Sequence, residues 1–144
     1  MLSKLLLAWC LLALSVAIHA TGLTLGFRWL RRRAAPAEGH VWPATWLLIL
    51  IAGWTLFLHL IEIAVWASAY AGLGAMPDLT TATYFSAVTY TTTGYGDLVL
   101  PGEWRLVGAI EALTGILMCG LSTGMFFAVF SKIFRLYGGN TSTD

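Results

Sequence analysis

Charged side chains are scarce in this sequence. Only 10% of its 144 residues are Asp, Glu, Lys or Arg, and 58% are hydrophobic, whereas a soluble globular domain carries about 25% charged residues. The formal net charge is +1, so there is no basic field to hold nucleic acid and no acidic tail to hold a basic partner. These shortages argue against a soluble fold and exclude a nucleic-acid-binding protein.

Cysteine and catalytic groupings are scarce as well. Cys10 and Cys119 both lie inside apolar runs and have no ligand spacing, so neither a disulfide framework nor a cysteine zinc site is indicated. The sequence also has no Ser/His arrangement and no paired carboxylates that would indicate an intramembrane hydrolase. We therefore expect that the protein is not an enzyme.

Long apolar runs are abundant. They extend from Leu5 to Phe27, from Val41 to about Ala71, and from Trp104 to Phe134. A bilayer core of about 30 Å needs about 20 apolar residues for each helix, so each run is long enough to cross it. The sequence therefore predicts an all-α membrane protein with three transmembrane helices.

The stretch between the second and third runs is too polar to span a membrane. Pro77 and Asp78 form a helix start, and a helix from Leu79 to about Thr91 would have about half the length of a span. Irregular backbone at membrane depth is tolerated only where protein buries it or water lines it. We predict a short re-entrant helix followed by an extended loop beside a cavity.

The distribution of positive charge predicts the topology. The link between the first two runs carries four arginines, namely Arg28, Arg31, Arg32 and Arg33. The segment from Tyr70 to Trp104 contains no Lys or Arg before Arg105. The positive-inside rule then places the link and the C-terminus in the cytoplasm and the N-terminus outside a cell membrane. The arginines would also meet anionic lipid head groups. A cleaved signal peptide, ending near Ala17, is the alternative.

The loop from Thr91 to Leu98 reads Thr-Thr-Thr-Gly-Tyr-Gly-Asp-Leu. A dehydrated monovalent cation needs a closed shell of oxygens, which backbone carbonyls supply without a fixed counter-charge. Gly94 and Gly96 allow successive carbonyls to point the same way. Tyr95 would point back into the surrounding protein as a spacer, and Thr92 would add its hydroxyl. One chain gives one oxygen per layer, so the motif predicts a homotetramer.

The run Thr92-Thr93-Gly94-Tyr95-Gly96-Asp97 resembles the potassium-channel signature. The resemblance covers roughly Val41 to Arg135, in the order outer helix, pore helix, filter and inner helix. It implies potassium ions bound at Thr92, Thr93, Gly94 and Tyr95, with Gly96 completing the filter. It also divides the chain into an extra N-terminal helix with its arginine-rich link (1–40), a pore domain (41–137) and a short polar tail (138–144).

The third run strengthens the resemblance. Gly115 stands where the family has its gating-hinge glycine, and the segment Ser122–Ala128 is similar to bacterial inward-rectifier channels. Ile116, Cys119 and Thr123 would line the cavity, with Phe127 or Phe130 closing the inner mouth by dewetting. For Gly108, Gly120 and Gly124 we favour close packing.

The sequence departs from the family at one position of the filter and at one position of the pore helix. Thr93 stands where Val or Ile is usual. Val88 stands where many bacterial members have a carboxylate that clamps the filter aspartate. Asp97 therefore needs another partner or faces solvent.

Two acids, Glu62 and Glu111, lie inside apolar runs, where a charge must be paired, protonated or facing water. We expect them to support the pore helix through hydrogen bonds in place of the missing clamp. His59 precedes Glu62 by three residues and shares its helix face. This pair leaves two alternatives open: a metal site, for which no third ligand is evident, and a pH sensor.

The leading hypothesis is thus a potassium-selective channel. A non-selective cation channel of the same architecture is a second reading, because Thr93 could loosen the filter. A non-conducting membrane anchor or assembly protein, whose loop is only a glycine-rich turn, is a third.

Overall fold

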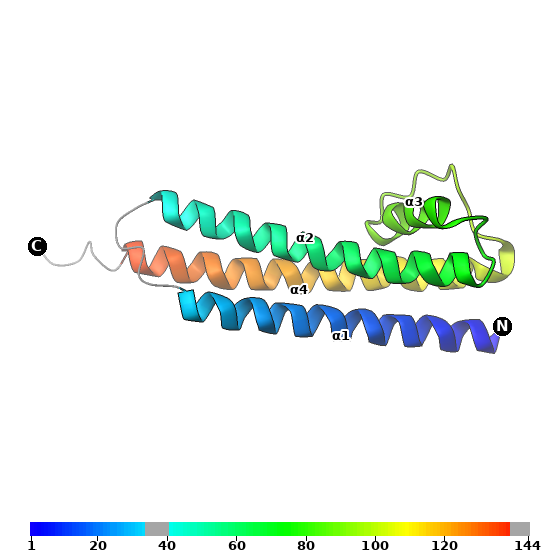
Figure 1. Cartoon of the computed structure of the whole chain (residues 1–144), viewed down its shortest axis with the longest axis horizontal. Coiled ribbons are helices and arrows are strands. Elements are labelled where there is room, and N and C mark those ends of the chain that lie inside the picture. The colour runs from blue at the N-terminus through cyan, green and yellow to red at the C-terminus, as the bar shows by residue number, and fades with distance from the viewer. Residues whose placement is uncertain (34–40, 139–144) are drawn as a thin grey trace, which may run out of the picture.

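The structure is a computed structural model that describes residues 1–33 and 41–138. In these ranges the chain forms helices joined by loops (Figure 1): α1 (Leu2–Arg33), α2 (Val41–Gly72), α3 (Leu79–Tyr90), the short 3₁₀ helix η1 (Gly102–Trp104) and α4 (Arg105–Gly138). Within this part of the chain, 3 helices are long and apolar enough to cross a membrane, over Leu2–Leu30, Trp42–Gly72 and Gly102–Ser131. The all-α fold class and the number of spanning helices are confirmed.

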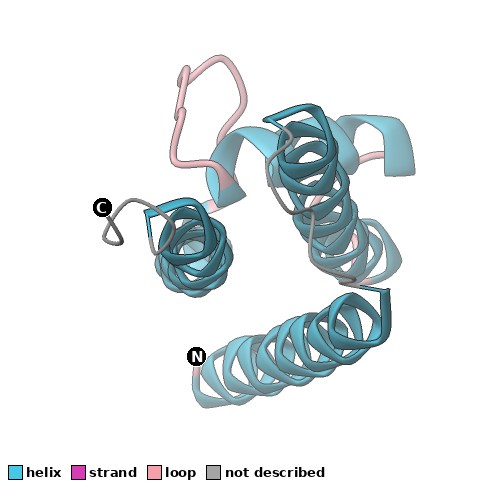
Figure 2. Ribbon diagram, turned by 90° about the vertical axis from the view of Figure 1, so that its left-hand side faces the viewer, coloured by secondary structure: helices cyan, strands magenta, loops and turns pink. Residues whose placement is uncertain are grey.

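The long helices α1, α2 and α4 run alongside one another, and α3 lies beside the C-terminal end of α2 (Figure 1). Viewed along the bundle, α1 and the loop after α3 lie on opposite sides of α2 and α4 (Figure 2). The N-terminus lies at the end of the bundle that carries α3. There Lys4 Nζ is 2.8 Å from a carboxylate oxygen of Glu103 and 4.4 Å from the centre of the Trp104 ring.

One face of α1 packs against the other long helices. Its buried residues recur every three or four positions up to Gly22 and again two turns later, as a helix face requires: Ala8, Leu11, Ser15, His19, Gly22 and Leu30. A Cβ atom at Gly22 would lie 2.4 Å from a terminal methyl group of Leu58 of α2, so a larger residue here would force the Leu58 side chain to move. The Trp54 indole donates a hydrogen bond of 3.0 Å to the Gly22 carbonyl. The first helix is therefore packed on the chain's own α2.

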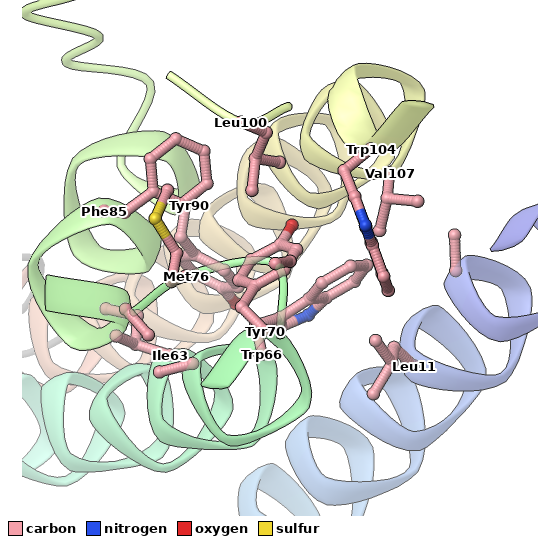
Figure 3. Close-up of a cluster of buried hydrophobic side chains, with 14 of the residues drawn as sticks. Leu11, Ile63, Trp66, Tyr70, Met76, Phe85, Tyr90, Leu100, Trp104 and Val107 are labelled. Carbon is pink, nitrogen blue, oxygen red and sulfur yellow. The ribbon is translucent and has the colours of Figure 1, made fainter. Parts of the chain in front are cut away.

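Aromatic side chains fill the core at the α3 end of the bundle (Figure 3). The Tyr70 ring of α2 packs edge to face on Phe85 of α3, at 5.5 Å between ring centres, and on Trp104 of η1, at 6.4 Å. Such geometry adds to the free energy gained from burying the rings. The Trp66 indole donates to Ser15 Oγ of α1 over 3.1 Å. This core fixes the position of α3 against all of its neighbours.

Local hydrogen bonds explain where α3 begins. Asp78 is its N-cap, and its carboxylate accepts from the Thr81 backbone N–H and the Thr81 hydroxyl, both over 2.8 Å. These two bonds lower the pKa of the Asp78 carboxyl below its usual value. Pro77 and Asp78 mark the helix start as predicted, with Asp78 as the N-cap and Pro77 just before it. The predicted helix from Leu79 to about Thr91 is confirmed, with its last residue at Tyr90.

Candidate functional site

The loop after α3 begins in a left-handed backbone conformation. The Thr92 N–H donates to the Thr89 carbonyl over 2.9 Å, and the Thr93 N–H donates to the Val88 carbonyl over 3.0 Å. This pair of bonds is the Schellman ending of a helix, which places the residue after the C-cap at positive φ, usually a glycine. Here that residue is Thr92, with φ of 59°. Since a β-branched residue is strained at this angle, the strain marks the start of the loop as a functional candidate.

Positive φ then recurs at alternate residues along the loop. Gly94 has φ of 56° and Gly96 has φ of 78°, and among the described residues Thr92 is the one non-glycine residue with positive φ. A Cβ atom at Gly94 or Gly96 would meet nothing within 4 Å. Backbone conformation, and not lack of space, therefore favours glycine at both positions.

The side chains of the loop are largely uncovered by the rest of the chain. Tyr95 is 71% exposed, so if it points back into surrounding protein, as predicted, that protein is another copy or another molecule. The Thr93 hydroxyl lies 3.0 Å from the Thr91 hydroxyl, which in turn donates to the Ala87 carbonyl over 2.7 Å. The hydroxyl that replaces the family's Val or Ile methyl group is thus tied to the end of α3.

Asp97 has a partner that the sequence analysis did not identify. The Tyr84 hydroxyl of α3 donates a hydrogen bond of 2.7 Å to Asp97 Oδ2. This bond to a carboxylate raises the pKa of the Tyr84 phenol above its usual value of 10.0. Both side chains are exposed. Tyr84 lies 13 residues before Asp97 in the sequence. Its hydroxyl could have been considered as a partner for Asp97, but nothing in the sequence fixes the path of the loop between the two residues.

Glu111 of α4 is buried against α3. The Ser86 hydroxyl of α3 donates to Glu111 Oε1, and the Tyr70 hydroxyl of α2 donates to Glu111 Oε2 over 2.8 Å. Ser86 Oγ also lies 3.0 Å from the Ile63 carbonyl. Glu111 therefore bonds to the short helix directly, which is the kind of contact expected of a supporting residue.

Glu62 of α2 is buried at the other end of α3. The hydroxyl of Tyr90, the last residue of α3, donates to Glu62 Oε2. His19 of α1 places Nδ1 at 2.8 Å from Glu62 Oε1, and His59 places Nδ1 at 3.7 Å from Glu62 Oε2. The sequence predicted the His59 and Glu62 neighbourhood but missed His19 and Tyr90, because neither is close to Glu62 in the sequence.

Ser122 of α4 completes this group, which we name the histidine cluster: His19, His59, Glu62, Tyr90 and Ser122. Ser122 Oγ lies 3.0 Å from His19 Nε2 and 3.1 Å from His59 Nε2. The cluster joins α1, α2, α3 and α4. Through Tyr90, the last residue of α3, it contacts the point where the loop begins.

Gly115 of α4 is in contact with the end of α3. A Cβ atom there would lie 1.9 Å from the Tyr90 carbonyl oxygen, so a glycine is needed for packing whatever its role as a hinge, which stays a prediction. Gly108 has a looser contact: a Cβ atom there would lie 3.0 Å from a terminal methyl group of Leu100, in line with the predicted packing role. Cβ atoms at Gly120 and Gly124 would meet nothing within 4 Å, so within this chain their predicted packing role is not met.

The residues predicted to line a cavity and gate share one exposed stripe of α4. They recur every three or four positions, which places them on one helix face, and all of them are exposed: Ile116, Cys119, Thr123, Phe127 and Phe130. Arg28 and Arg32 are exposed on the last turns of α1, at the end of the bundle away from the loop. The side chains of Arg31 and Arg33 lie outside the described residues.

Comparison with known families agrees with this geometry. A family model described as an ion channel matches residues 44–132, more than half of the chain, and this range contains α3, the loop and most of α2 and α4. No curated protein and no solved structure matches the chain.

Proposed function

Because this chain belongs to the ion channel family, we propose that it is a potassium-selective channel in which four copies surround one pore. Ions pass down their gradient between backbone carbonyls of Thr92, Thr93, Gly94, Tyr95 and Gly96. Membership of this family favours a channel over an enzyme.

The observation that carries the proposal is the alternation of φ along the loop. In an ordinary strand successive peptide units face opposite sides. Positive φ at every second residue, at Thr92, Gly94 and Gly96, turns alternate peptide units over, so that consecutive carbonyls can share one side. A row of carbonyls on one side is what replaces the hydration shell of a dehydrated ion.

The number of oxygens requires more than one copy. One chain contributes one carbonyl to each layer, and a closed shell around a cation needs several at the same level. Cyclic assembly of four chains supplies them with a single repeated contact. The exposed loop and the exposed stripe of α4 support this assembly, because both leave apolar and backbone groups uncovered in one chain.

The helices around the loop supply the remaining parts. α3 ends at Tyr90, so the negative end of its dipole lies where the filter begins and lowers the cost of a cation at that depth. Ile116, Cys119 and Thr123 line the cavity below the filter, and Phe127 or Phe130 closes its inner mouth. Asp97 with Tyr84, Glu111 with Ser86, and Glu62 with Tyr90 hold the filter from behind.

We further place the channel in the cell membrane with the N-terminus and the loop outside. Both lie at one end of the bundle, whereas the arginines at the end of α1 lie at the other. That orientation satisfies the positive-inside rule and sets Arg28 and Arg32 near anionic head groups.

Potassium flux into liposomes tests the proposal. The purified full chain should admit potassium, and barium should block it. Gly94→Ala should abolish the flux, because Ala is strained at φ of 56° although a Cβ would have space. Gly53→Ala is the matched control, since Gly53 on α2 has the same open surroundings without positive φ, and its flux should be unchanged.

Reversal potentials in mixed sodium and potassium then decide selectivity. A potential that follows the potassium gradient supports the proposal. A potential midway between the two gradients would assign the chain to the non-selective alternative. An assembled protein that passes neither ion at any tested voltage or lipid composition would contradict the channel proposal and favour the non-conducting membrane anchor.

A further inference from the structure

The geometry points to a divalent transition-metal site of the Zn²⁺ class in the histidine cluster, with His19, His59 and Glu62 as ligands. The site is separate from the proposed ion path, because its ligands lie behind Tyr90, whereas the path is formed by backbone carbonyls of the loop. It also needs no assumption about selectivity or assembly, since all three ligands belong to one chain.

Three observations on distance support the site. One ligand atom from each of the three residues lies within 4.8 Å of the others. Both imidazoles present the same atom, Nδ1, to the Glu62 carboxylate, at 2.8 Å for His19 and 3.7 Å for His59. In a tetrahedral site with Zn–ligand bonds of about 2.0–2.1 Å, neighbouring ligand atoms lie roughly 3.4 Å apart, so small side-chain adjustments suffice.

The far side of both imidazoles has the arrangement of a metal-ligating histidine. Ligating histidines donate the second ring N–H to a fixed acceptor, which sets the ring orientation. Here both Nε2 atoms lie within hydrogen-bonding distance of one oxygen, Ser122 Oγ, at 3.0 and 3.1 Å. A serine oxygen has two lone pairs, so it can accept from both rings when both Nδ1 atoms bind a metal.

One assignment of the hydrogens in the cluster leaves room for a cation beside His59. With Glu62 ionised and both imidazoles neutral, Tyr90 and His19 donate to the carboxylate, Ser122 donates to His19, and His59 donates to Ser122. The bare Nδ1 of His59 then faces the Tyr90 oxygen at 3.4 Å and Glu62 Oε2 at 3.7 Å, with no hydrogen between them. A metal ion bound at this corner would give the His59 Nδ1 atom a partner in that assignment.

Ligand chemistry selects the class of metal. Two imidazole nitrogens and one carboxylate suit Zn²⁺, Cu²⁺ or Ni²⁺, whereas potassium, Mg²⁺ and Ca²⁺ prefer oxygen ligands alone. The hydroxyl of Tyr90, which already bonds to Glu62, is the nearest candidate for a fourth ligand. The side chain of His59 is 15% exposed, which leaves an approach to an otherwise buried site. A bound ion would join α1 and α2 to the end of α3.

Metal binding to the purified full chain in detergent is the test. Metal-free protein dialysed against ZnCl₂ should bind one Zn²⁺ per chain. Its thermal midpoint should rise with Zn²⁺ concentration, as expected for a ligand of the folded state. Co²⁺ should give the intense visible bands of a four-coordinate site. These readouts need no ion flux, so their failure would leave the channel proposal standing.

Variants assign the ligands. His59→Gln and Glu62→Gln should lose the stoichiometric ion. Ser122→Ala keeps all three ligands and should weaken binding by about 10–100-fold. His40→Gln is the matched control: the chain has 3 histidines, and His40, which lies outside the described residues, is the one not in the cluster. Wild-type protein that neither binds Zn²⁺ nor is stabilised by it, or binding that depends on His40, would overturn the proposal.

Discussion

At the scale of single residues, the loop is shaped by backbone conformation at a few positions. Thr92 adopts φ of 59° because the Schellman ending of α3 demands it, although threonine is poorly suited to that angle. In the proposed channel the Thr92 hydroxyl, which glycine lacks, is the group that would justify this strain.

Thr92→Gly should therefore increase the stability of the protein and decrease its potassium flux. Relief of the left-handed strain, about 1–2 kcal/mol, less the extra chain entropy of glycine, should raise the free energy of unfolding by about 0.5–1 kcal/mol. Potassium flux should fall, because the hydroxyl is lost. Thr92→Ala is the control that removes the hydroxyl and keeps the strain. Thermal unfolding and liposome flux measure the two effects, and a Gly variant less stable than the Ala variant would contradict this account.

Gly115 offers a second test at this scale. Ala at this position would bring Cβ to 1.9 Å from the Tyr90 carbonyl oxygen, so α3 and α4 must separate. Overpacking of this kind costs about 1–3 kcal/mol, and we expect that loss in the free energy of unfolding of Gly115→Ala. Gly120→Ala on the same helix has open surroundings and should change stability little. Equal effects of the two variants would show that contact with Tyr90 is not what requires glycine.

At the scale of elements, the Asp78 cap makes the stability of α3 depend on pH. The Asp78 carboxylate accepts two hydrogen bonds from Thr81, and its pKa in the folded protein is lowered by them. Its stabilising effect is therefore complete above the pKa of the unfolded chain, about 3.9, and is lost as pH falls through the lower folded value.

Asp78→Ala should lower the thermal midpoint near neutral pH, because the Thr81 N–H loses its acceptor. The difference from wild type should shrink as the solution is acidified below about pH 4. Asp78→Asn, an equally good cap that does not titrate in this range, should keep a constant advantage over Asp78→Ala. A pH-independent difference between wild type and Asp78→Ala would show that the carboxylate is not the cap that matters.

The same elements show how far sequence reasoning reaches. The apolar runs and the Pro77–Asp78 start predict the helices, because length, hydropathy and capping are local properties. Glu62, in contrast, contacts two residues that are distant in the sequence: His19 is 43 residues away and Tyr90 is 28 residues away. They depend on which face of α1 packs on α2, and several faces of an apolar helix are equally hydrophobic. The histidine cluster therefore could not be predicted from periodicity.

At the scale of the whole molecule, one chain leaves its candidate machinery unfinished. In the proposed channel the loop carbonyls of one chain would form only one side of the ion site, and the stripe from Ile116 to Phe130 is exposed along α4. Both features are explained together if copies of the chain place these surfaces around a common axis.

Mixing subunits measures how many copies share one filter. Wild type and Gly94→Ala, expressed in equal amounts and assembled at random, should give about one-sixteenth of the wild-type potassium flux if any defective member of a tetramer blocks conduction. About one-quarter would indicate two chains per pore, and about one-half would mean that each chain conducts alone, which contradicts the assembly proposed here. Mixing with Gly53→Ala should leave the flux unchanged, and separate affinity tags on the two chains should confirm that they assemble together. Because the result depends only on the number of chains per filter, it tests assembly independently of which cation is selected.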